Sequence, residues 1–130
     1  MGNGSSNIYP VHVLGRSYQD TDQEELLKHT ESFFRFTYRR DIPAFCSSSL
    51  TSDAGWGCML RAAQMVMGNT LLRHYLGPDW RIPPDVQASR VRRSRQQTLA
   101  ENAVYCELVR WFSDHPGAPH LYSLHHLVHL

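Results

Sequence analysis

One segment, residues 59–76, limits the fold of this chain more than any other. Apolar residues occupy nearly every side of a helix drawn over it: Met59, Leu60, Ala62, Ala63, Met65, Val66, Met67, Leu71, Leu72 and Leu76. A helix that is apolar all round is buried in the middle of a larger core. Gly77 and Pro78 then end the helix. We therefore expect a central helix that other elements must cover on several sides.

The residues before this helix predict a short strand, a first helix and a loop. Residues 11–18 partly alternate between apolar and polar, which favours a strand. Thr21 is followed three residues later by Glu24, the spacing of a capping box. Apolar residues then recur at helical spacing, which predicts a helix that runs to about residue 36. The Ser-rich residues 44–52 are expected to form a loop.

The residues after the central helix predict a loop and two more helices. Residues 81–97 are Arg-rich without an apolar face and are expected to form an exposed loop. Thr98 and Glu101 match a second capping box, which predicts a helix to about residue 112. Its inward side chains would be Val104, Leu108, Trp111 and Phe112. After a turn at 113–119, Ser123 is expected to cap a last helix over residues 124–130.

Composition excludes several classes of protein. The chain has 130 residues, 42% of them hydrophobic and 19% charged, which suits one domain or part of a larger one. A net charge of +1 provides no long-range attraction for nucleic acid or an anionic membrane. No apolar run approaches the roughly 18 residues of a spanning helix. Residues 1–7 do not resemble a secretory signal and are expected to be a disordered leader.

The three cysteines differ in their surroundings. Cys46, Cys58 and Cys106 show no CxxC spacing, which argues against a disulfide framework or a zinc site and favours free thiols in the cytoplasm. Cys58 follows Gly55-Trp56-Gly57 at the predicted start of the central helix. A thiolate is the nucleophilic form of cysteine, and the N-terminus of a helix favours that anion. Cys58 is therefore the candidate nucleophile, with a buried packing role as the alternative.

Two long motifs surround this cysteine. The sequence FTYRRDIP fills residues 36–43, and LTSDAGWGCMLR fills residues 50–61. Together they closely resemble the autophagins, which are autophagy cysteine proteases that cleave ubiquitin-like modifiers of the GABARAP type. Residues 11–16 and the Arg-rich stretch resemble the vertebrate subtypes lettered D and C.

The resemblance implies an α+β, papain-like fold, in which residues 8–130 form the helical N-terminal part of a truncated peptidase domain. Cys58 matches the family's nucleophile, and Tyr38 matches a tyrosine whose hydroxyl is thought to donate to the oxyanion. The family supplies its base from an Asp-Pro-His segment far downstream, which this chain lacks. We reject Asp114-His115-Pro116 as a substitute, because it lies in a turn of the helical half. The resemblance implies no cofactor and no metal.

Other interpretations remain open. The chain is either part of an active peptidase or an inert product that binds the modifier or the full-length enzyme. An unrelated helical interaction module is a third possibility, which the length of the motif disfavours. His125 and His129 are four residues apart and share a helix face, but no third metal ligand is evident. The partners implied are the modifiers, with no nucleic acid, and with membranes contacted only through a lipidated substrate.

Overall fold

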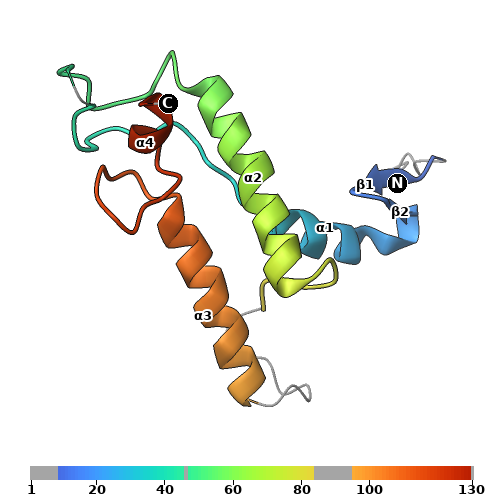
Figure 1. The fold of residues 1–130 in the computed structure, drawn as a ribbon. Coiled ribbons are helices and arrows are strands. Elements are labelled where there is room, and N and C mark those ends of the chain that lie inside the picture. The colour runs from blue at the N-terminus through green and yellow to red at the C-terminus, as the bar shows by residue number, and fades with distance from the viewer. Residues whose placement is uncertain (1–8, 46, 84–94, 130) are drawn as a thin grey trace.

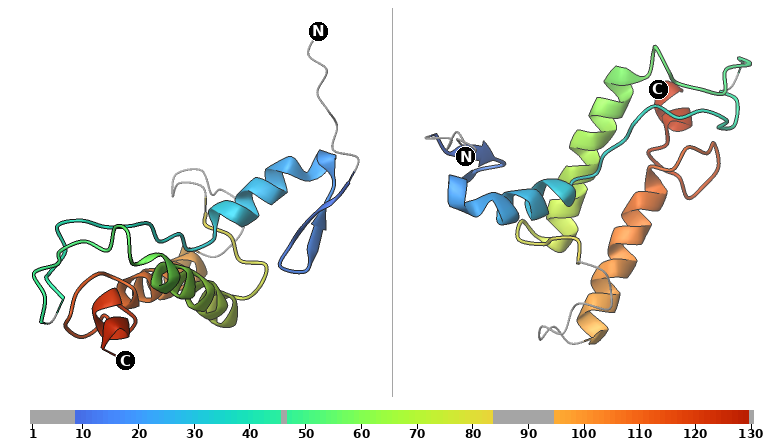
Figure 2. Two further views of the ribbon diagram at one scale, coloured as in Figure 1. Left: turned by 90° about the horizontal axis from the view of Figure 1, so that it is seen from above. Right: turned by 180° about the vertical axis from the view of Figure 1, so that it is seen from behind.

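The computed structural model describes residues 9–45, 47–83 and 95–129, without the side chains of residues 95–98. The elements in chain order are β1 (Val11–Val13), β2 (Arg16–Tyr18), a 3-10 turn η1 (Asp20–Asp22), α1 (Gln23–Glu31), α2 (Cys58–Leu76), α3 (Arg95–Trp111) and α4 (Leu124–Val128). In Figure 1, α2 and α3 lie side by side and run antiparallel, and α4 lies near the first turn of α2. The hairpin and α1 project from this helical body, as Figure 2 shows. The predicted leader at residues 1–7 lies outside the described residues.

The first strand is in fact a hairpin. β1 and β2 pair antiparallel, with Val11 opposite Tyr18 and Val13 opposite Arg16. Leu14 and Gly15 between them have φ angles of 47° and 82°. Two positive φ angles are what a two-residue hairpin turn of type I′ requires. The prediction of a single strand over residues 11–18 was therefore wrong, because Leu14 takes a left-handed conformation that is uncommon for leucine.

Helix α1 differs from its prediction at both ends. Asp20–Asp22 forms a 3-10 turn, and the backbone N–H of Gln19 donates to Asp22 at 2.9 Å, so Thr21 does not cap the helix. α1 ends at Glu31 instead of residue 36. Beyond it, Asn69 of α2 accepts from the backbone N–H of Phe34 at 2.9 Å and donates to its carbonyl at 3.3 Å. These long-range bonds replace the helical ones and hold Phe34 in an extended segment against α2.

Helix α2 covers the predicted range and begins one residue earlier, at Cys58. Gly77 ends it with a φ of 88°, in the left-handed region that glycine adopts without strain. The buried stripe of α2 consists of Arg61, Gln64, Gly68 and Leu72. On its other side, Met59 is 80% exposed and Val66 is 71% exposed. The described residues therefore cover one side of α2 and leave much of its apolar surface uncovered.

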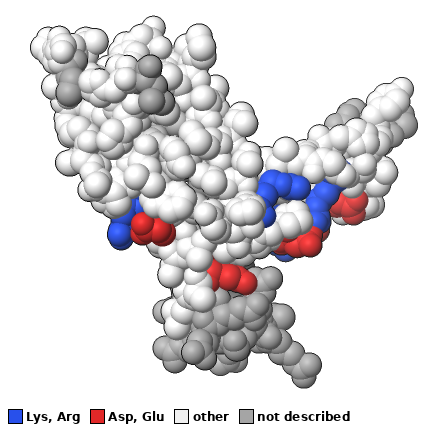
Figure 3. Space-filling model, viewed as in Figure 1, with Lys and Arg blue, Asp and Glu red and all other residues white. Residues whose placement is uncertain are grey.

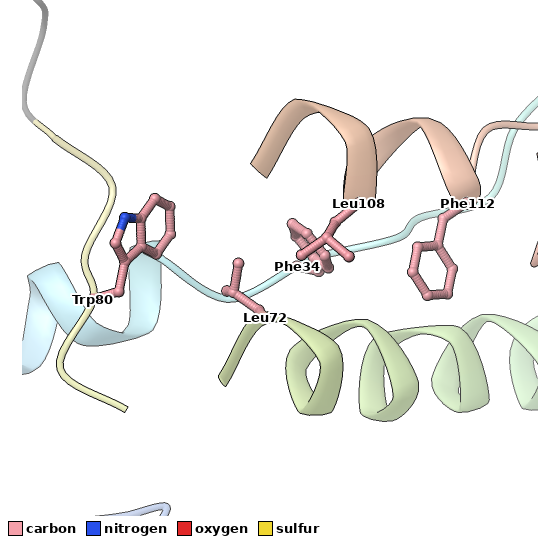
Figure 4. Packing of buried hydrophobic residues seen from close by; sticks show 5 residues of the cluster. All are labelled: Phe34, Leu72, Trp80, Leu108 and Phe112. Atoms are coloured by element: carbon pink, nitrogen blue, oxygen red, sulfur yellow. The ribbon is translucent and has the colours of Figure 1, made fainter. Parts of the chain in front are cut away.

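The core lies between α2, α3 and the extended segment after α1. Its buried members, shown in Figure 4, are Phe34, Leu72, Trp80, Leu108 and Phe112. The predicted inward residues Leu108 and Phe112 are 1% and 2% exposed. α3 begins at Arg95, so the predicted capping box fails because Thr98 lies inside the helix. The Arg-rich loop prediction falls mostly on residues 84–94, outside the described residues, and was wrong for residues 95–97, which belong to α3.

The cap of α4 was predicted correctly. Ser123 lies just before the helix, and its hydroxyl accepts from the backbone N–H of His126 at 3.3 Å. α4 ends at Val128, and Leu130 lies outside the described residues. A cap that acts within three residues depends only on local sequence, which explains its predictability. None of the described helices is long and apolar enough to span a bilayer.

Gly68 gives a test of this packing. A Cβ built on Gly68 would lie 2.5 Å from the Phe34 ring, which is itself held in the core. We expect Gly68→Ala to destabilise the fold by about 1–2 kcal/mol, because overpacking outweighs the better helix propensity of alanine. Chemical denaturation measures this. Thr70→Ala at an exposed position of the same helix is the control and should change stability little; an equally stable Gly68→Ala would contradict this packing.

Candidate active site

Cys58 is the first residue of α2, and its side chain is exposed as a free thiol. Gly57 is the N-cap and provides no side-chain cap. The N–H groups of the first turn of a helix have no partner within it, and they carry a partial positive charge. A thiol at this position is accessible to a substrate. The predicted placement of Cys58 at the helix start is thus what the structure shows.

A tight turn over residues 53–57 leads the chain into Cys58. The carbonyl of Asp53 accepts from the backbone N–H groups of Trp56 at 3.2 Å and Gly57 at 2.8 Å. Gly55 has a φ of 87°, which favours glycine. A Cβ on Gly57 would lie 2.4 Å from the Asp53 carboxylate. The Asp53 carboxylate therefore occupies the space beside Gly57. Only a residue without a Cβ allows these two parts of the turn to lie so close together.

Tyr38 lies beside Cys58, although twenty residues separate them in the sequence. The neighbouring Arg39 brings this segment to the turn, since its carbonyl accepts from the backbone N–H of Asp53 at 3.4 Å and the hydroxyl of Ser52 at 2.7 Å. Loss of hydration, and after it the charge and hydrogen bonding of the nearby Cys58 thiol, raise the pKa of the Tyr38 hydroxyl. The hydroxyl therefore stays protonated at neutral pH and is available as a donor. The structure brings together the two residues singled out as catalytic.

Trp56 braces the loop in front of this site. Its indole N–H donates to the carbonyl of Ser52 at 3.0 Å, and its ring meets Phe45 edge to face at 5.0 Å. His125 of α4 stacks on the Phe45 ring with the ring centroids 4.5 Å apart, and its Nε2 is hydrogen-bonded to the carbonyl of Pro43 at 2.5 Å. Trp56 is 37% exposed and packs onto the loop through these contacts.

The remaining candidates lie elsewhere. Cys106 is exposed within α3, and Cys46 lies outside the described residues. Asp114 accepts from Arg61 at 2.7 Å, and His115 accepts from the backbone N–H of Gly117 at 3.1 Å. Within the described part of the chain, no group of three His, Cys, Asp or Glu side chains is arranged to hold a metal ion.

Sequence reasoning missed a buried polar cluster beneath the site, formed by Asp53, Arg61 and Gln64. These residues are 0%, 3% and 0% exposed. Arg61 Nε donates to Asp53 at 2.7 Å, and Arg61 Nη1 donates to Gln64 at 3.2 Å. Gln64 in turn donates to the carbonyl of Tyr122 at 2.8 Å. The signal in the sequence was a charged and an amide side chain, three residues apart, in the otherwise apolar first half of α2.

The charges of this cluster are well defined. Burial alone would raise the pKa of Asp53, but hydrogen bonds from Arg61 and the backbone N–H of Arg39 outweigh it and hold that pKa below its ordinary value. Burial likewise opposes the charge of Arg61, yet its hydrogen bonds to Asp53 and Asp114 raise the pKa of the guanidinium. Asp53 and Arg61 are therefore an ion pair at neutral pH, buried next to the turn that carries Cys58.

Comparisons with known proteins relate this chain to one family of peptidases. Residues 23–130 match the model of the Peptidase C54 catalytic domain. The chain is 34% identical to cysteine protease ATG4D of Xenopus laevis, over 96% of this chain and 33% of the relative. It is 48% identical to cysteine protease ATG4B of Gallus gallus over 55% of this chain and 19% of the relative. Cysteine protease atg4 of Dictyostelium discoideum is 32% identical over 85% of this chain and 13% of the relative.

These matches fix how much of the family the chain represents. It spans about a third of the length of the Xenopus laevis relative and less of the other two. The family match and the mostly helical structure with its small hairpin confirm the α+β, papain-like fold class for this part. The chain belongs to the peptidase C54 family.

Proposed function

We propose that the chain supplies the nucleophilic part of an autophagy cysteine peptidase that hydrolyses the bond after the C-terminal glycine of a ubiquitin-like modifier of the GABARAP type. The observation that carries this proposal is the position of Cys58 at the start of α2 with Tyr38 beside it. The same reaction would mature a modifier precursor and release a modifier from its lipid. The relatives from Xenopus laevis and Gallus gallus are named as cysteine proteases, which supports this proposal.

The arrangement suits the first step of acyl transfer. The Cys58 thiolate attacks the carbonyl carbon of the substrate, and the carbonyl oxygen becomes an oxyanion in the tetrahedral intermediate. The backbone N–H of Cys58 has no partner within the helix, and the Tyr38 hydroxyl is protonated. In this proposal both groups donate hydrogen bonds to the oxyanion. The C–N bond then breaks as the leaving nitrogen takes up the proton that Cys58 gave to the general base, and water hydrolyses the thioester at Cys58.

The general base of this reaction lies outside the chain in our proposal. Among the residues that the structure describes, no histidine is hydrogen-bonded to Cys58. The family resemblance assigns the base to a downstream Asp-Pro-His segment, for which the two thirds of the Xenopus laevis relative beyond the match leave room. We place the activity in the cytoplasm, in keeping with the free thiols of Cys58 and Cys106.

A cleavage assay tests the proposed substrate. A GABARAP-type modifier with a C-terminal extension is incubated with the intact protein that contains this chain. We expect one cut after the glycine, and no cut in C-terminally extended ubiquitin, which is the control for the modifier. Cleavage of neither substrate, or equal cleavage of both, would contradict the proposal.

Tyr38→Phe tests the oxyanion role. Removing one oxyanion donor typically lowers kcat by about 10²–10³-fold, so we expect a weakened but detectable peptidase. KM should change little, because the hydroxyl acts on the charge that develops in the transition state. Steady-state kinetics on the modifier precursor measure both constants. An unchanged kcat would mean that Tyr38 only packs its ring at the loop boundary.

A second candidate function is favoured by the exposed apolar side of α2, where Met59 and Val66 are uncovered. An inert product with this surface would bind the modifier or a complete copy of the enzyme. Pull-down of the chain with purified modifier or enzyme, combined with an absence of cleavage, separates this function from the first one.

A further inference from the structure

We propose that Asp53 and Arg61 are positioning residues that hold the Tyr38 segment at a fixed place beside Cys58. This inference rests on the proposed function and adds to it the elements that set the geometry between nucleophile and oxyanion donor. Neither residue touches the reacting atoms, so their role is exerted through the two segments that they join.

Asp53 ties the Tyr38 segment to the turn before Cys58. Its Oδ1 accepts from the backbone N–H of Arg39 at 2.8 Å, and its own carbonyl accepts from the backbone N–H of Gly57 at 2.8 Å. Arg39 follows Tyr38 directly, and Gly57 precedes Cys58 directly. Asp53 therefore fixes the backbone next to each of the two proposed catalytic residues. In our proposal, a shift of Asp53 moves the Tyr38 segment relative to the turn that precedes Cys58.

Arg61 fixes Asp53 in turn. Its Nε donates to Asp53 Oδ2 at 2.7 Å from the first turn of the helix that begins at Cys58. Its Nη1 donates to Asp114 at 2.7 Å in the segment after α3. The guanidinium thus joins the nucleophile helix, the turn before it and the α3 end of the helical body. Because the Arg61 side chain is 3% exposed, solvent does not compete for these bonds.

Stability alone is a poor explanation for this pair. Removing two charges from water costs several kcal/mol, and replacing a buried ion pair by apolar residues is often neutral or stabilising. The hydrogen bonds of Asp53 and Arg61 are directional and involve ionised groups, so they instead specify one geometry. A misplacement of about 1 Å at a reaction centre can lower the rate by about 10²-fold. A role in positioning would therefore change the reaction rate measurably, whereas the net contribution of the ion pair to the free energy of folding is expected to be small.

Asp53→Asn in the intact protein tests the inference directly. The amide oxygen can still accept from the backbone N–H of Arg39. The other position of the amide then places an NH₂ group, which cannot accept, against Arg61 Nε, and this weakens the hydrogen bond that joins the turn to α2. We expect kcat to fall by about 10–10²-fold with little change in KM. In a Tyr38→Phe background the same substitution should cost much less, because the donor that it positions is already gone. A full additional loss in that background would overturn the inference.

Two further variants guard against a merely structural effect. Asn69→Ala breaks the bonds that hold Phe34 to the same helix, away from Cys58. It should lower the free energy of unfolding, while kcat per folded molecule and the loss of kcat caused by Tyr38→Phe stay unchanged. Ser52→Ala removes the hydroxyl that donates to the Arg39 carbonyl and accepts from the backbone N–H of Ala54, and it is expected to fold. It should lower kcat by about fivefold, and again less in the Tyr38→Phe background.

The outcomes separate this inference from the proposed function. If wild type cleaves the precursor, Cys58→Ala does not, and both Asp53→Asn and Ser52→Ala keep the wild-type kcat, the inference fails and the function stands. If Cys58→Ala cleaves like wild type, the proposed function itself fails. Should Asp53→Asn not fold, Ser52→Ala decides, and an unchanged kcat for Ser52→Ala overturns the inference.

Discussion

We expect Cys58→Ala to abolish the peptidase activity of the intact protein that contains this chain. The reaction proposed here passes through a thioester at Cys58, and alanine has no group that can form it. Cys58 is exposed at the start of α2, so substrate access does not limit this role. A time course of precursor cleavage measures the effect, and the residual rate should not exceed the uncatalysed rate.

The other cysteines provide the controls for this substitution. Cys106 lies within α3, away from a helix terminus, and Cys106→Ala should leave turnover nearly intact. The same is expected of Cys46→Ala, since Cys46 has no activating neighbour in the sequence. If Cys58→Ala cut the precursor at the wild-type rate, or if Cys106→Ala alone removed activity, the assignment of the nucleophile would be wrong.

The second large effect concerns residues 1–130 as an isolated chain, which we expect to be inert and to self-associate. Met59, Val66 and Tyr75 on α2 are 80%, 71% and 54% exposed. On the face seen in Figure 3, no charged side chain shows over the first half of α2 or around α4. An uncharged, partly apolar surface of this kind promotes association. Without a base for Cys58, the dipole of α2 alone does not complete the catalytic site.

Two measurements check this expectation. Light scattering of the purified chain should report a mass above that of a single copy, and the precursor should remain uncut. Met59→Glu with Val66→Glu is a matched variant, which should reduce association without restoring cleavage. A monodisperse wild-type chain that cleaves the precursor would mean that one of its own histidines, for example His115, acts as the base.

Local sequence predicted those parts of the fold that depend on local interactions. The bounds of α2 followed from its apolar residues and from Gly77, whose positive φ ends the helix. The cap at Ser123 followed from one side chain and a backbone group three residues away. The end of α1 was not predictable in this way, because Asn69 of α2 holds Phe34 out of the helix from 35 residues away.

The site shows the same division. The position of Cys58 at a helix start was predictable from the glycines before it and the apolar residues after it, and Tyr38 was singled out by a family motif alone. Asp53 and Arg61 went unnoticed, because their importance depends on contacts with Arg39 and Asp114 that only the folded chain brings together. A charged residue in an apolar stretch of helix indicates a buried polar partner, and Arg61 in the first half of α2 is the signal of that kind in this sequence.

The most direct test of the central claim is covalent labelling by a probe made from the modifier, with a thiol-reactive group in place of the bond after its C-terminal glycine. The account predicts one adduct per molecule of intact protein, located at Cys58 by peptide mapping, and slower labelling in Tyr38→Phe. Cys106 should remain unlabelled in the same sample. An adduct at another cysteine, or equal labelling after Cys58→Ala, would contradict the claim that Cys58 is the nucleophile of a modifier-specific peptidase.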